Sequence, residues 1–354
     1  MTNASLSPAP LILECLEVRT ETPTVKSFVL GTTAGQVLSH RPGQALTLAL
    51  DVDGERLYRT FSIASAPSAD GRVELTIKAH PQGRATRWLH RALQPGMQVE
   101  ARGPVGRFVF DAGNGNGVGR PVALVSAGSG ASPLMAMLRT LAVTAPETDI
   151  AWFHIARTPD EVLFGAEIEA LQRRMPRLSA AVAVTRPEPG WFGFRGRPTR
   201  RLLSVAMPDF GRRDTYCCGP DGFMRTLALI HDAEGGDAGR FHIEHFGPVT
   251  PDPDAAAAVA SPGGAPGSGE VYRVTFGGKA FEAAAGETIL AAATRRQVVI
   301  PCGCASGLCG TCRVRRVSGT VTMRHNGGLS EAEEAQGFIL ACSSRPTSDV
   351  EIAL

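Results

Sequence analysis

The sequence predicts a multidomain chain in which an antiparallel β-barrel, an α/β domain with a parallel sheet and a small α+β domain follow one another. Its 354 residues suit two or three domains. Residues 10–111 contain many short strand patterns and little helix, which is typical of a β-barrel. From about residue 119 strand and helix patterns alternate, which is typical of a parallel sheet. Residues 270–354 combine a hairpin pattern with five of the eight cysteines.

The barrel is expected over residues 1–112. Its strand patterns alternate or run apolar, and β-branched residues are frequent in them. The predicted strands are Leu11 to Val18, Val25 to Leu30, Ala45 to Val52, Thr60 to Ser65 and Val73 to Ala79. One helix-like stretch, Ala85 to Leu93, interrupts them.

The α/β domain is expected over residues 118–248. A short apolar run, Pro121 to Val125, precedes a glycine-rich turn and a helical period through Leu134 and Leu141. Further strands and helices then alternate. They are a strand Ile150 to Ala156, a helix Ala166 to Gln172, a strand Ser179 to Thr185, a strand Arg213 to Cys218 and a helix Phe223 to Leu229.

A linker is predicted over residues 249–269, because this stretch is mostly Pro, Ala, Gly, Ser and Asp and cannot bury enough apolar surface to fold alone. The third domain, 270–354, opens with an alternating hairpin around Val274 and Phe281. A short helix, Thr288 to Ala293, is expected just before the cysteine-rich loop.

Composition excludes several classes of protein. The chain is 43% apolar and 20% charged with a net charge of +2, which argues against bulk nucleic-acid binding. No apolar run reaches the length of a membrane span. The segment from Met1 to Ser5 lacks the features of a signal peptide. A cytoplasmic location is therefore expected, where thiols stay reduced.

The cysteines carry the strongest motif in the chain. Cys304, Cys309 and Cys312 have the spacing C-x4-C-x2-C, and Cys342 follows at a distance. This is the ligand spacing of a plant-type [2Fe–2S] cluster. Gly307 and Gly310 supply the freedom that the backbone needs to place the first three ligands in one short loop, and the fourth ligand, Cys342, comes from another part of the chain. Zinc is the main alternative, although it favours paired C-x2-C units and the chain has no second one.

Cys302 fits no ligand position in that spacing, so we interpret it as a spare thiol near the cluster. A disulfide framework does not suit a long chain with most of its cysteines in one segment.

Two motifs of the α/β domain suggest a nucleotide site. Gly128-Ser129-Gly130 lies between a strand and a helix, where glycines let a pyrophosphate approach the helix N-terminus. The motif lacks the third glycine of the usual dinucleotide fingerprint, and a tight structural turn is the alternative. Cys218-Gly219-Pro220 ends a later strand and should lie on the same rim of the sheet. The alternative for Cys218 is a buried apolar thiol.

The barrel also carries polar groups that suit a phosphate. Arg59 in Arg59-Thr60-Phe61-Ser62 can make bidentate phosphate contacts, and Phe61 can lie against a planar ring. In Gly83-Arg84-Ala85-Thr86 we expect Thr86 to cap the helix that follows. A surface charge and an ordinary cap are the alternatives.

Together these motifs resemble the ferredoxin–NADP reductase superfamily, in the branch with a C-terminal plant-type [2Fe–2S] ferredoxin domain. The resemblance spans nearly the whole chain and implies a flavin barrel, a nicotinamide domain and a ferredoxin-like β-grasp domain. The order of the domains is that of the reductase components of Rieske-type oxygenases, including those that demethylate glycine betaine. The reductases of the hybrid-cluster protein and of phenylacetyl-CoA epoxidation share it.

The resemblance implies roles for individual residues. Arg59 would hold the flavin phosphate and Ser62 would bond near flavin N5, whereas Phe61 replaces the usual tyrosine. Cys218 and Ser62 would flank the hydride path, with Glu244 as a polar or proton contact. The implied flavin and nucleotide contacts are Arg59, Thr60, Phe61, Ser62, Gly83, Thr86, Gly128, Gly130, Ser132, Pro133, Cys218, Gly219, Pro220 and Phe246.

The implied activity is electron transfer from NAD(P)H through flavin and cluster to an external acceptor. A nicotinamide gives two electrons together and the cluster accepts one, so the flavin must separate them. FAD is favoured over FMN by Gly83 and Thr86. NADH is favoured over NADPH, because Asp160 and Glu161 would repel an added phosphate, although Arg157 could meet one.

The acceptor is expected to be a transiently bound oxygenase component. Hybrid-cluster protein and a diiron epoxidase are the alternative acceptors, and a non-catalytic electron carrier or redox sensor is the alternative class. Arg313, Arg315 and Arg316 follow the cluster loop and form either a docking patch for an acidic partner or a solvated strand face.

Overall fold

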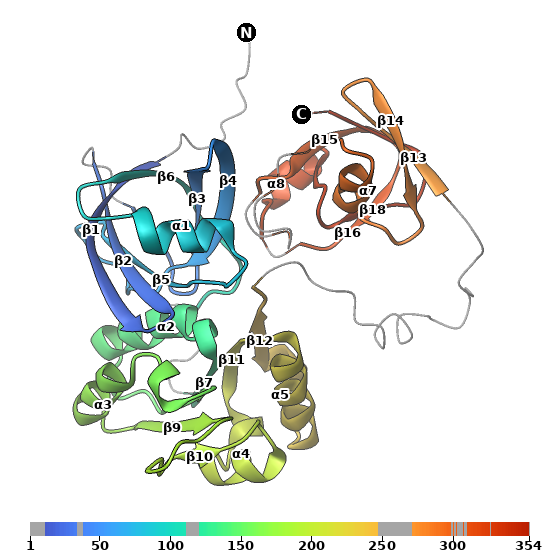
Figure 1. Cartoon of the computed structure of the whole chain (residues 1–354). Coiled ribbons are helices and arrows are strands. Elements are labelled where there is room, and N and C mark those ends of the chain that lie inside the picture. Colours follow the sequence, from blue (N-terminus) through green and yellow to red (C-terminus); the bar gives the residue numbers. More distant parts are fainter. Residues whose placement is uncertain are drawn as a thin grey trace. The chain divides into compact units, whose positions relative to one another are not determined.

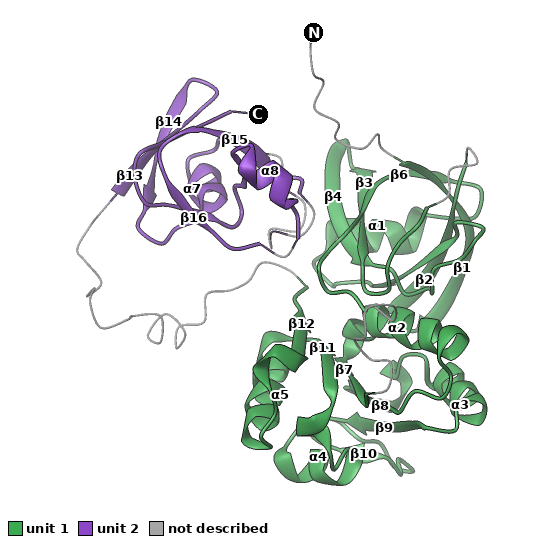
Figure 2. Ribbon diagram, turned by 180° about the vertical axis from the view of Figure 1, so that it is seen from behind, with its two compact units in different colours: residues 1–246 green, residues 247–354 purple. Residues whose placement is uncertain are grey.

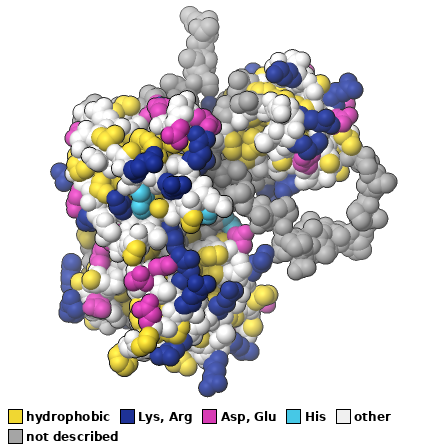
Figure 3. Space-filling view, in the orientation of Figure 1, with side chains coloured by type: hydrophobic (Ala, Val, Ile, Leu, Met, Phe, Trp, Pro, Cys, Tyr) yellow, Lys and Arg dark blue, Asp and Glu magenta, His cyan; other side chains and the backbone are white. Residues whose placement is uncertain are grey.

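A computed structural model of the chain describes residues 11–33, 38–110, 120–246, 271–298, 300, 302, 307, 310–325 and 327–353. The chain divides into two compact units, residues 1–246 and residues 247–354 (Figure 2). The first unit contains both the barrel and the α/β domain. Acidic and basic side chains are interspersed over the face that Figure 3 shows, in keeping with the small net charge.

The barrel is a six-stranded antiparallel sheet in the order β4-β3-β6-β1-β2-β5 (Figure 1). Ile63, just after β4, bridges to Leu75 on β5 and so joins the two edge strands. Its core is aliphatic and includes Leu13, Leu48 and Leu75. The elements are β1 (Leu11–Thr22), β2 (Val25–Thr32), β3 (Ala45–Val52), β4 (Glu55–Ser62), β5 (Val73–Lys78), α1 (Arg84–Ala92) and β6 (Gln98–Val105).

Strand β6 was not predicted from the sequence. It contains charged residues together with Gly103 and Pro104, so its pattern is weak, and it forms because β1 and β3 pair with it on either side. The predicted strand at Thr60 begins earlier than expected, at Glu55.

The α/β domain has a six-stranded parallel sheet in the order β10-β9-β8-β7-β11-β12. Alternate residues of the strands face opposite layers: one apolar cluster packs under α2 and α3, and the other packs under α4 and α5. The strands are β7 (Val122–Ala127), β8 (Ile150–Ala156), β9 (Leu178–Val184), β10 (Phe194–Arg195), β11 (Asp214–Cys218) and β12 (Phe241–Glu244). The helices are η1 (Gly128–Gly130), α2 (Ala131–Thr144), η2 (Pro159–Glu161), α3 (Gly165–Arg174), α4 (Arg200–Ala206), η3 (Phe210–Arg212), α5 (Asp221–Ala233) and η4 (Ala238–Arg240).

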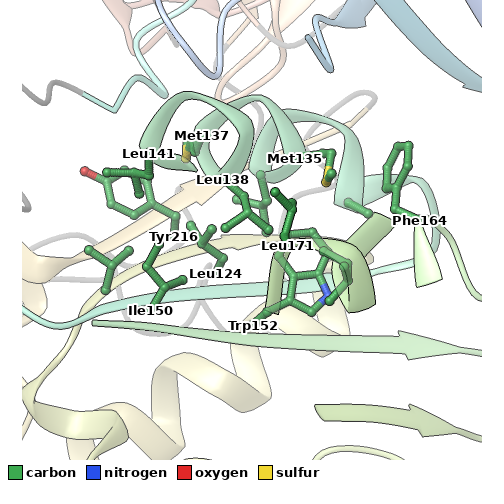
Figure 4. Close-up of a cluster of buried hydrophobic side chains, with 14 of the residues drawn as sticks. Leu124, Met135, Met137, Leu138, Leu141, Ile150, Trp152, Phe164, Leu171 and Tyr216 are labelled. Carbon is green, nitrogen blue, oxygen red and sulfur yellow. The ribbon is translucent and has the colours of Figure 1, made fainter. Parts of the chain in front are cut away.

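The core beneath α2 fixes where that helix begins. Met135, Leu138 and Leu141 point from α2 toward Leu124 and Trp152 of the sheet (Figure 4). Each such side chain contributes roughly 1.5–3 kcal/mol when it is fully buried. The glycine turn at the N-terminus of α2 is therefore held at the carboxyl end of β7.

The second unit is a mixed five-stranded sheet in the order β14-β13-β19-β15-β17, with a two-stranded sheet of β16 and β18. β13 and β19 are parallel neighbours and the other pairs are antiparallel. Helix α7 packs into the core of this sheet, as the predicted β-grasp fold requires. The elements are β13 (Val271–Phe276), β14 (Lys279–Ala284), α7 (Ile289–Arg295), β15 (Arg313–Ser318), β16 (Val321–Met323), α8 (Glu331–Ala335), β17 (Phe338–Leu340), β18 (Ser344–Pro346) and β19 (Val350–Ala353).

Local signals start α7 and α8, the two helices in the described part of this unit. Thr288 caps α7 by accepting from Ala291 N at 3.3 Å. Ser330 and Glu333 form a capping box at the start of α8. Of the helices in the described part of the chain, none combines the length and apolar character of a membrane span.

Candidate cofactor and electron-transfer site

Strand β4 carries the arginine motif of the barrel. Successive side chains of a strand point to opposite faces, so Arg59 and Phe61 share one face while Thr60 and Ser62 share the other. Arg59 is exposed and donates from Nη1 to Tyr58 O at 2.7 Å. Ser62 is only 6% exposed, at the end of the strand. This arrangement fits a charged phosphate contact near Arg59 and a buried hydroxyl at Ser62.

The polar side of β4 is also anchored in the barrel. Thr60 Oγ1 lies 2.9 Å from Thr47 Oγ1 on β3, and Phe61 packs partly against the barrel core. Thr60 is thus held by its neighbouring strand, and Phe61 is only partly buried.

The start of α1 corrects one expectation. Thr86 is not the N-cap; Gly83 occupies that position, and among the described residues no side chain caps the helix. Thr86 lies one turn in, where its hydroxyl accepts from His80 N at 3.1 Å and donates to Gly83 O at 3.4 Å. A Cβ at Gly83 would lie 2.5 Å from that hydroxyl, so only glycine fits this turn. The first-turn N–H groups suit a phosphate oxygen.

The two predicted nucleotide motifs meet at the carboxyl rim of the parallel sheet. Gly128 has a φ of +55° and makes the turn into α2. A Cβ at Gly130 would collide with the carbonyl oxygen of Cys218, so the two loops touch through their backbones. Gly219 is similarly enclosed by Phe223 and Ala127. Pro220 starts α5, a second helix at this rim.

Ser132 and Pro133 lie in the first turn of α2 and are buried. Ser132 Oγ lies 3.0 Å from Ser129 O and 3.2 Å from Thr76 O on β5. Its hydroxyl therefore connects the nucleotide loop to the barrel, a role that the sequence did not reveal.

Four buried polar side chains form a row across the sheet at this rim. Strand register places His154 of β8 beside Ser126 of β7, then Cys218 of β11, then Glu244 of β12. All four are buried and point to the face that α2 covers. Because His154 Nε2 accepts from Leu163 N at 3.5 Å, its proton lies on Nδ1, which bonds Ser126 Oγ at 2.9 Å.

His154 and Cys218, two members of this row, are both uncharged at neutral pH. Burial lowers the pKa of His154 to about 4. Burial, with the nearby carboxylate of Glu244, raises the pKa of Cys218 well above its ordinary value, so it is a thiol rather than a thiolate. Phe246, two residues beyond Glu244, is 47% exposed. His154 and Ser126 were not predicted as site residues from the sequence; their positions at the ends of adjacent buried strands were the available signal.

In the second unit the structure describes two of the four predicted cluster ligands. Cys312 and Cys342 are buried, and Gly307 N donates to Cys342 Sγ at 3.2 Å. Contact with Cys342 and burial raise the pKa of the Cys312 thiol. Such paired, buried sulfurs with an N–H donor fit a thiolate-ligated cluster. Cys304 and Cys309 lie outside the described residues, within which no three His, Cys, Asp or Glu side chains gather to hold a metal.

The glycines of the cluster loop have the conformation expected for it. Gly307 and Gly310 have φ values of +73° and +69°. Cys302 is partly exposed and close enough to Cys312 to affect its pKa. Its interpretation as a spare thiol stays a prediction.

Three family models match the chain. They are an oxidoreductase FAD-binding domain over residues 14–110, an oxidoreductase NAD-binding domain over residues 124–228 and a 2Fe-2S iron-sulfur cluster binding domain over residues 274–347. The fold and site thus define an oxidoreductase that binds FAD, a nicotinamide nucleotide and a [2Fe–2S] cluster.

Curated relatives match along almost the whole chain. The glycine betaine monooxygenase reductase subunit of Chromohalobacter salexigens is 35% identical over 353 residues, covering 96% of this chain and 94% of the relative. The stachydrine N-demethylase reductase subunit of Rhizobium meliloti is 35% identical over 347 residues, covering 96% and 95%. The chain belongs to the ferredoxin–NADP reductase superfamily, in the branch with a C-terminal [2Fe–2S] ferredoxin domain.

Solved structures show the same fold. The FAD/NAD-binding domain of nitric oxide dioxygenase from Vibrio cholerae matches 67% of this chain and 99% of its own, with a TM-score of 0.61 and 28% identity. Phthalate dioxygenase reductase matches 98% of both chains with a TM-score of 0.59 and 23% identity. The predicted three-part fold and the expectation of FAD are confirmed.

Proposed function

We propose that the chain is the NADH-dependent reductase component of a Rieske-type oxygenase and passes electrons from NADH through FAD and the [2Fe–2S] cluster to that partner. The single observation that carries the proposal is near-complete coverage by relatives named as reductase subunits of glycine betaine monooxygenase and stachydrine N-demethylase. The bound flavin supplies the conversion between two-electron and one-electron transfer.

The site residues have distinct tasks in this proposal. Arg59 and the N-terminus of α1, with Gly83 and Thr86, hold the FAD phosphates. Ser62 presents a buried hydroxyl toward the flavin ring, where a fixed donor can orient it.

The rim of the parallel sheet holds the nicotinamide. The touching loops at Gly130 and Cys218 give it a preformed floor. Because Cys218 stays a neutral thiol, it supplies a nonpolar wall that excludes water and does not act as a base. Glu244, beside it on β12, is the acid that can hold a proton or an amide group.

The choice of NADH rests on Arg157, the arginine available to a 2′-phosphate. Its guanidinium is already paired with Glu161, at 3.1 Å from Nε to Oε2 and 2.7 Å from Nη2 to Oε1. Lys78 Nζ lies 3.3 Å from the same carboxylate. A 2′-phosphate would have to displace Glu161 against its charge, which favours NADH over NADPH.

For partner docking, the three arginines after the cluster loop differ. Arg313 pairs with Glu333 and lies 5.0 Å over the Phe338 ring, and Arg316 donates to Gly319 O. Arg315 is exposed on β15. We therefore place the attraction for an acidic, transiently bound partner at Arg315. Reduced thiolate ligands also favour a reducing compartment such as the cytoplasm.

The test is reconstitution. Purified protein should contain FAD and iron and sulfide in about two-to-two proportion, and NADH should bleach the flavin under anaerobic conditions. Addition of a candidate oxygenase should then give NADH-driven product. Bound flavin that NADH fails to reduce would contradict the proposal, and product formed only with a hybrid-cluster protein or a diiron epoxidase would change the acceptor.

A further inference from the structure

Arg139 on α2 joins the α/β domain to the barrel inside the first unit. Its side chain is 17% exposed, and its guanidinium bonds two carboxylates and a carbonyl and lies over one ring. A buried guanidinium is tolerated only when its donors are satisfied, and its planar shape fixes the partners' geometry.

On the barrel side, Arg139 forms hydrogen bonds with the segment that follows β4, the strand that ends at Ser62. Nη1 donates to Ala64 O at 2.9 Å and to Glu74 Oε1 at 2.8 Å. Ala64 lies two residues after Ser62, and its N–H bonds Glu74 O at 2.8 Å. Glu74 also pairs with Arg19 on β1. The strand end that carries Ser62 is therefore tied to Arg139 through a carbonyl and a carboxylate.

On the α/β side, Arg139 is anchored to α3. Nε and Nη2 each donate to the carboxylate of Glu167 at 2.7 Å, and the guanidinium lies 5.4 Å over the ring of Phe164. Arg139 also lies on α2 itself, about 12 Å along the helix from the nucleotide loop at its N-terminus. The rigid helix α2 thus connects the glycine turn at residues 128–130 to the hydrogen bonds of Arg139.

Two weaker contacts link the same parts. Ser132 Oγ donates to Thr76 O at 3.2 Å, and Lys78 Nζ lies 3.3 Å from Glu161. Arg139 differs from both because it bonds the segment next to Ser62 directly and satisfies two carboxylates at once.

We propose that Arg139 is a positioning residue for hydride transfer. It fixes the distance between Ser62 at the end of β4 and the glycine turn Gly128–Gly130 that precedes α2. This inference rests on the proposed function. Small displacements of reacting groups lower transfer rates strongly. Loss of the hydrogen bonds from Arg139 to Ala64 and Glu74 should therefore slow flavin reduction more than it weakens nucleotide binding.

The experiment compares R139M, R139K and R213M with the wild-type protein. Arg213 is a matched control: its side chain is 9% exposed, and it pairs with Asp149 at 2.8 Å and Asp209 at 2.7 Å within the α/β domain. Stopped-flow absorbance at saturating NADH should show flavin reduction at least tenfold slower in R139M, with R139K intermediate. R213M should lose thermal stability but reduce its flavin within twofold of wild type.

A second measurement does not depend on activity. In flavin-free protein, hydrogen exchange at the amides of Ala64 and Glu74 should be faster in R139M and unchanged in R213M. The inference would be overturned if R139M reduced its flavin at the wild-type rate. It would also be overturned if R139M and R213M slowed flavin reduction equally. If R139M does not fold, E167Q decides: slower reduction supports the inference, and an unchanged rate overturns it. Wild-type flavin that NADH does not reduce would instead refute the proposed function.

Discussion

At the scale of single residues, the rim of the parallel sheet requires a residue without a side chain at position 130. Gly130 leaves no side chain between the nucleotide loop and the backbone of Cys218. The glycine motif alone did not distinguish a phosphate site from a structural turn. The structure shows that Gly130 is needed for the contact between the two loops, and its role in binding a nucleotide stays a prediction.

Gly130→Ala should therefore separate the two loops. We expect the affinity for NAD+ to fall at least tenfold and the melting temperature to fall, while FAD stays bound. Gly222→Ala is the control, since nothing lies within 4 Å of its Cβ position near the start of α5; it should be neutral or slightly stabilising. Calorimetric titration with NAD+ measures the effect, and unchanged affinity in Gly130→Ala would contradict it.

His154 should make the free energy of unfolding depend on pH. Its pKa is about 4 because the ring is wholly buried, whereas in the unfolded chain it is near 6.5. As pH falls below 6.5 the unfolded state takes up a proton that the folded state refuses, so stability falls with pH, by about 2 kcal/mol at pH 5. His154→Gln should remove this part of the decline.

Urea unfolding followed by tryptophan fluorescence between pH 7.5 and 5 tests this, because Trp88, Trp152 and Trp191 all lie in the first unit. Parallel pH profiles in the wild type and His154→Gln would show that His154 does not carry the effect.

At the scale of elements, helix starts and strand ends position the residues of the proposed binding sites. Helix α1 begins at a glycine, and Thr86 holds the preceding turn instead of capping the helix. The expectation that Thr86 caps this helix was wrong, because a cap and a first-turn threonine differ only in backbone path. Strand register in turn brings His154, Ser126, Cys218 and Glu244 into one row.

Thr86→Val should loosen the turn before α1, which we propose binds the FAD diphosphate. Loss of its hydrogen bonds to His80 and Gly83 should weaken FAD binding by about 1 kcal/mol, or roughly fivefold. Thr140→Val is the control, since it removes a threonine bond to Ala136 O on α2, away from this turn. Dissociation of FAD measured by fluorescence recovery checks the difference, and equal loss in both variants would argue against a specific role.

At the scale of the whole molecule, one chain combines an FAD domain, an NAD domain and a cluster domain. The proposed electron path therefore runs between cofactors of one protein, and in that path the last transfer is the one that requires a partner. The surface around the cluster domain should therefore affect partner turnover and not the earlier steps.

Arg315→Glu should slow transfer to the partner oxygenase and leave NADH oxidation by an artificial dye unchanged, because charge reversal weakens a transient encounter. Arg273→Glu, an equal charge change at an exposed arginine of β13, should affect the partner less. Steady-state turnover at low ionic strength measures both. Unaltered partner turnover in Arg315→Glu would remove the docking role.

The sequence by itself determined the three-part fold, the cofactor class and the residues of the motifs, because cysteine spacing and glycine-rich turns at strand ends are local patterns with local physical causes. Only the tertiary structure decided how those motifs meet. Three contacts join segments that are far apart in the chain. They are the contact of Gly130 with Cys218, the buried row from His154 to Glu244 and the hydrogen bond from Arg139 to Ala64 O. Such contacts depend on strand order and helix packing, which no local pattern encodes.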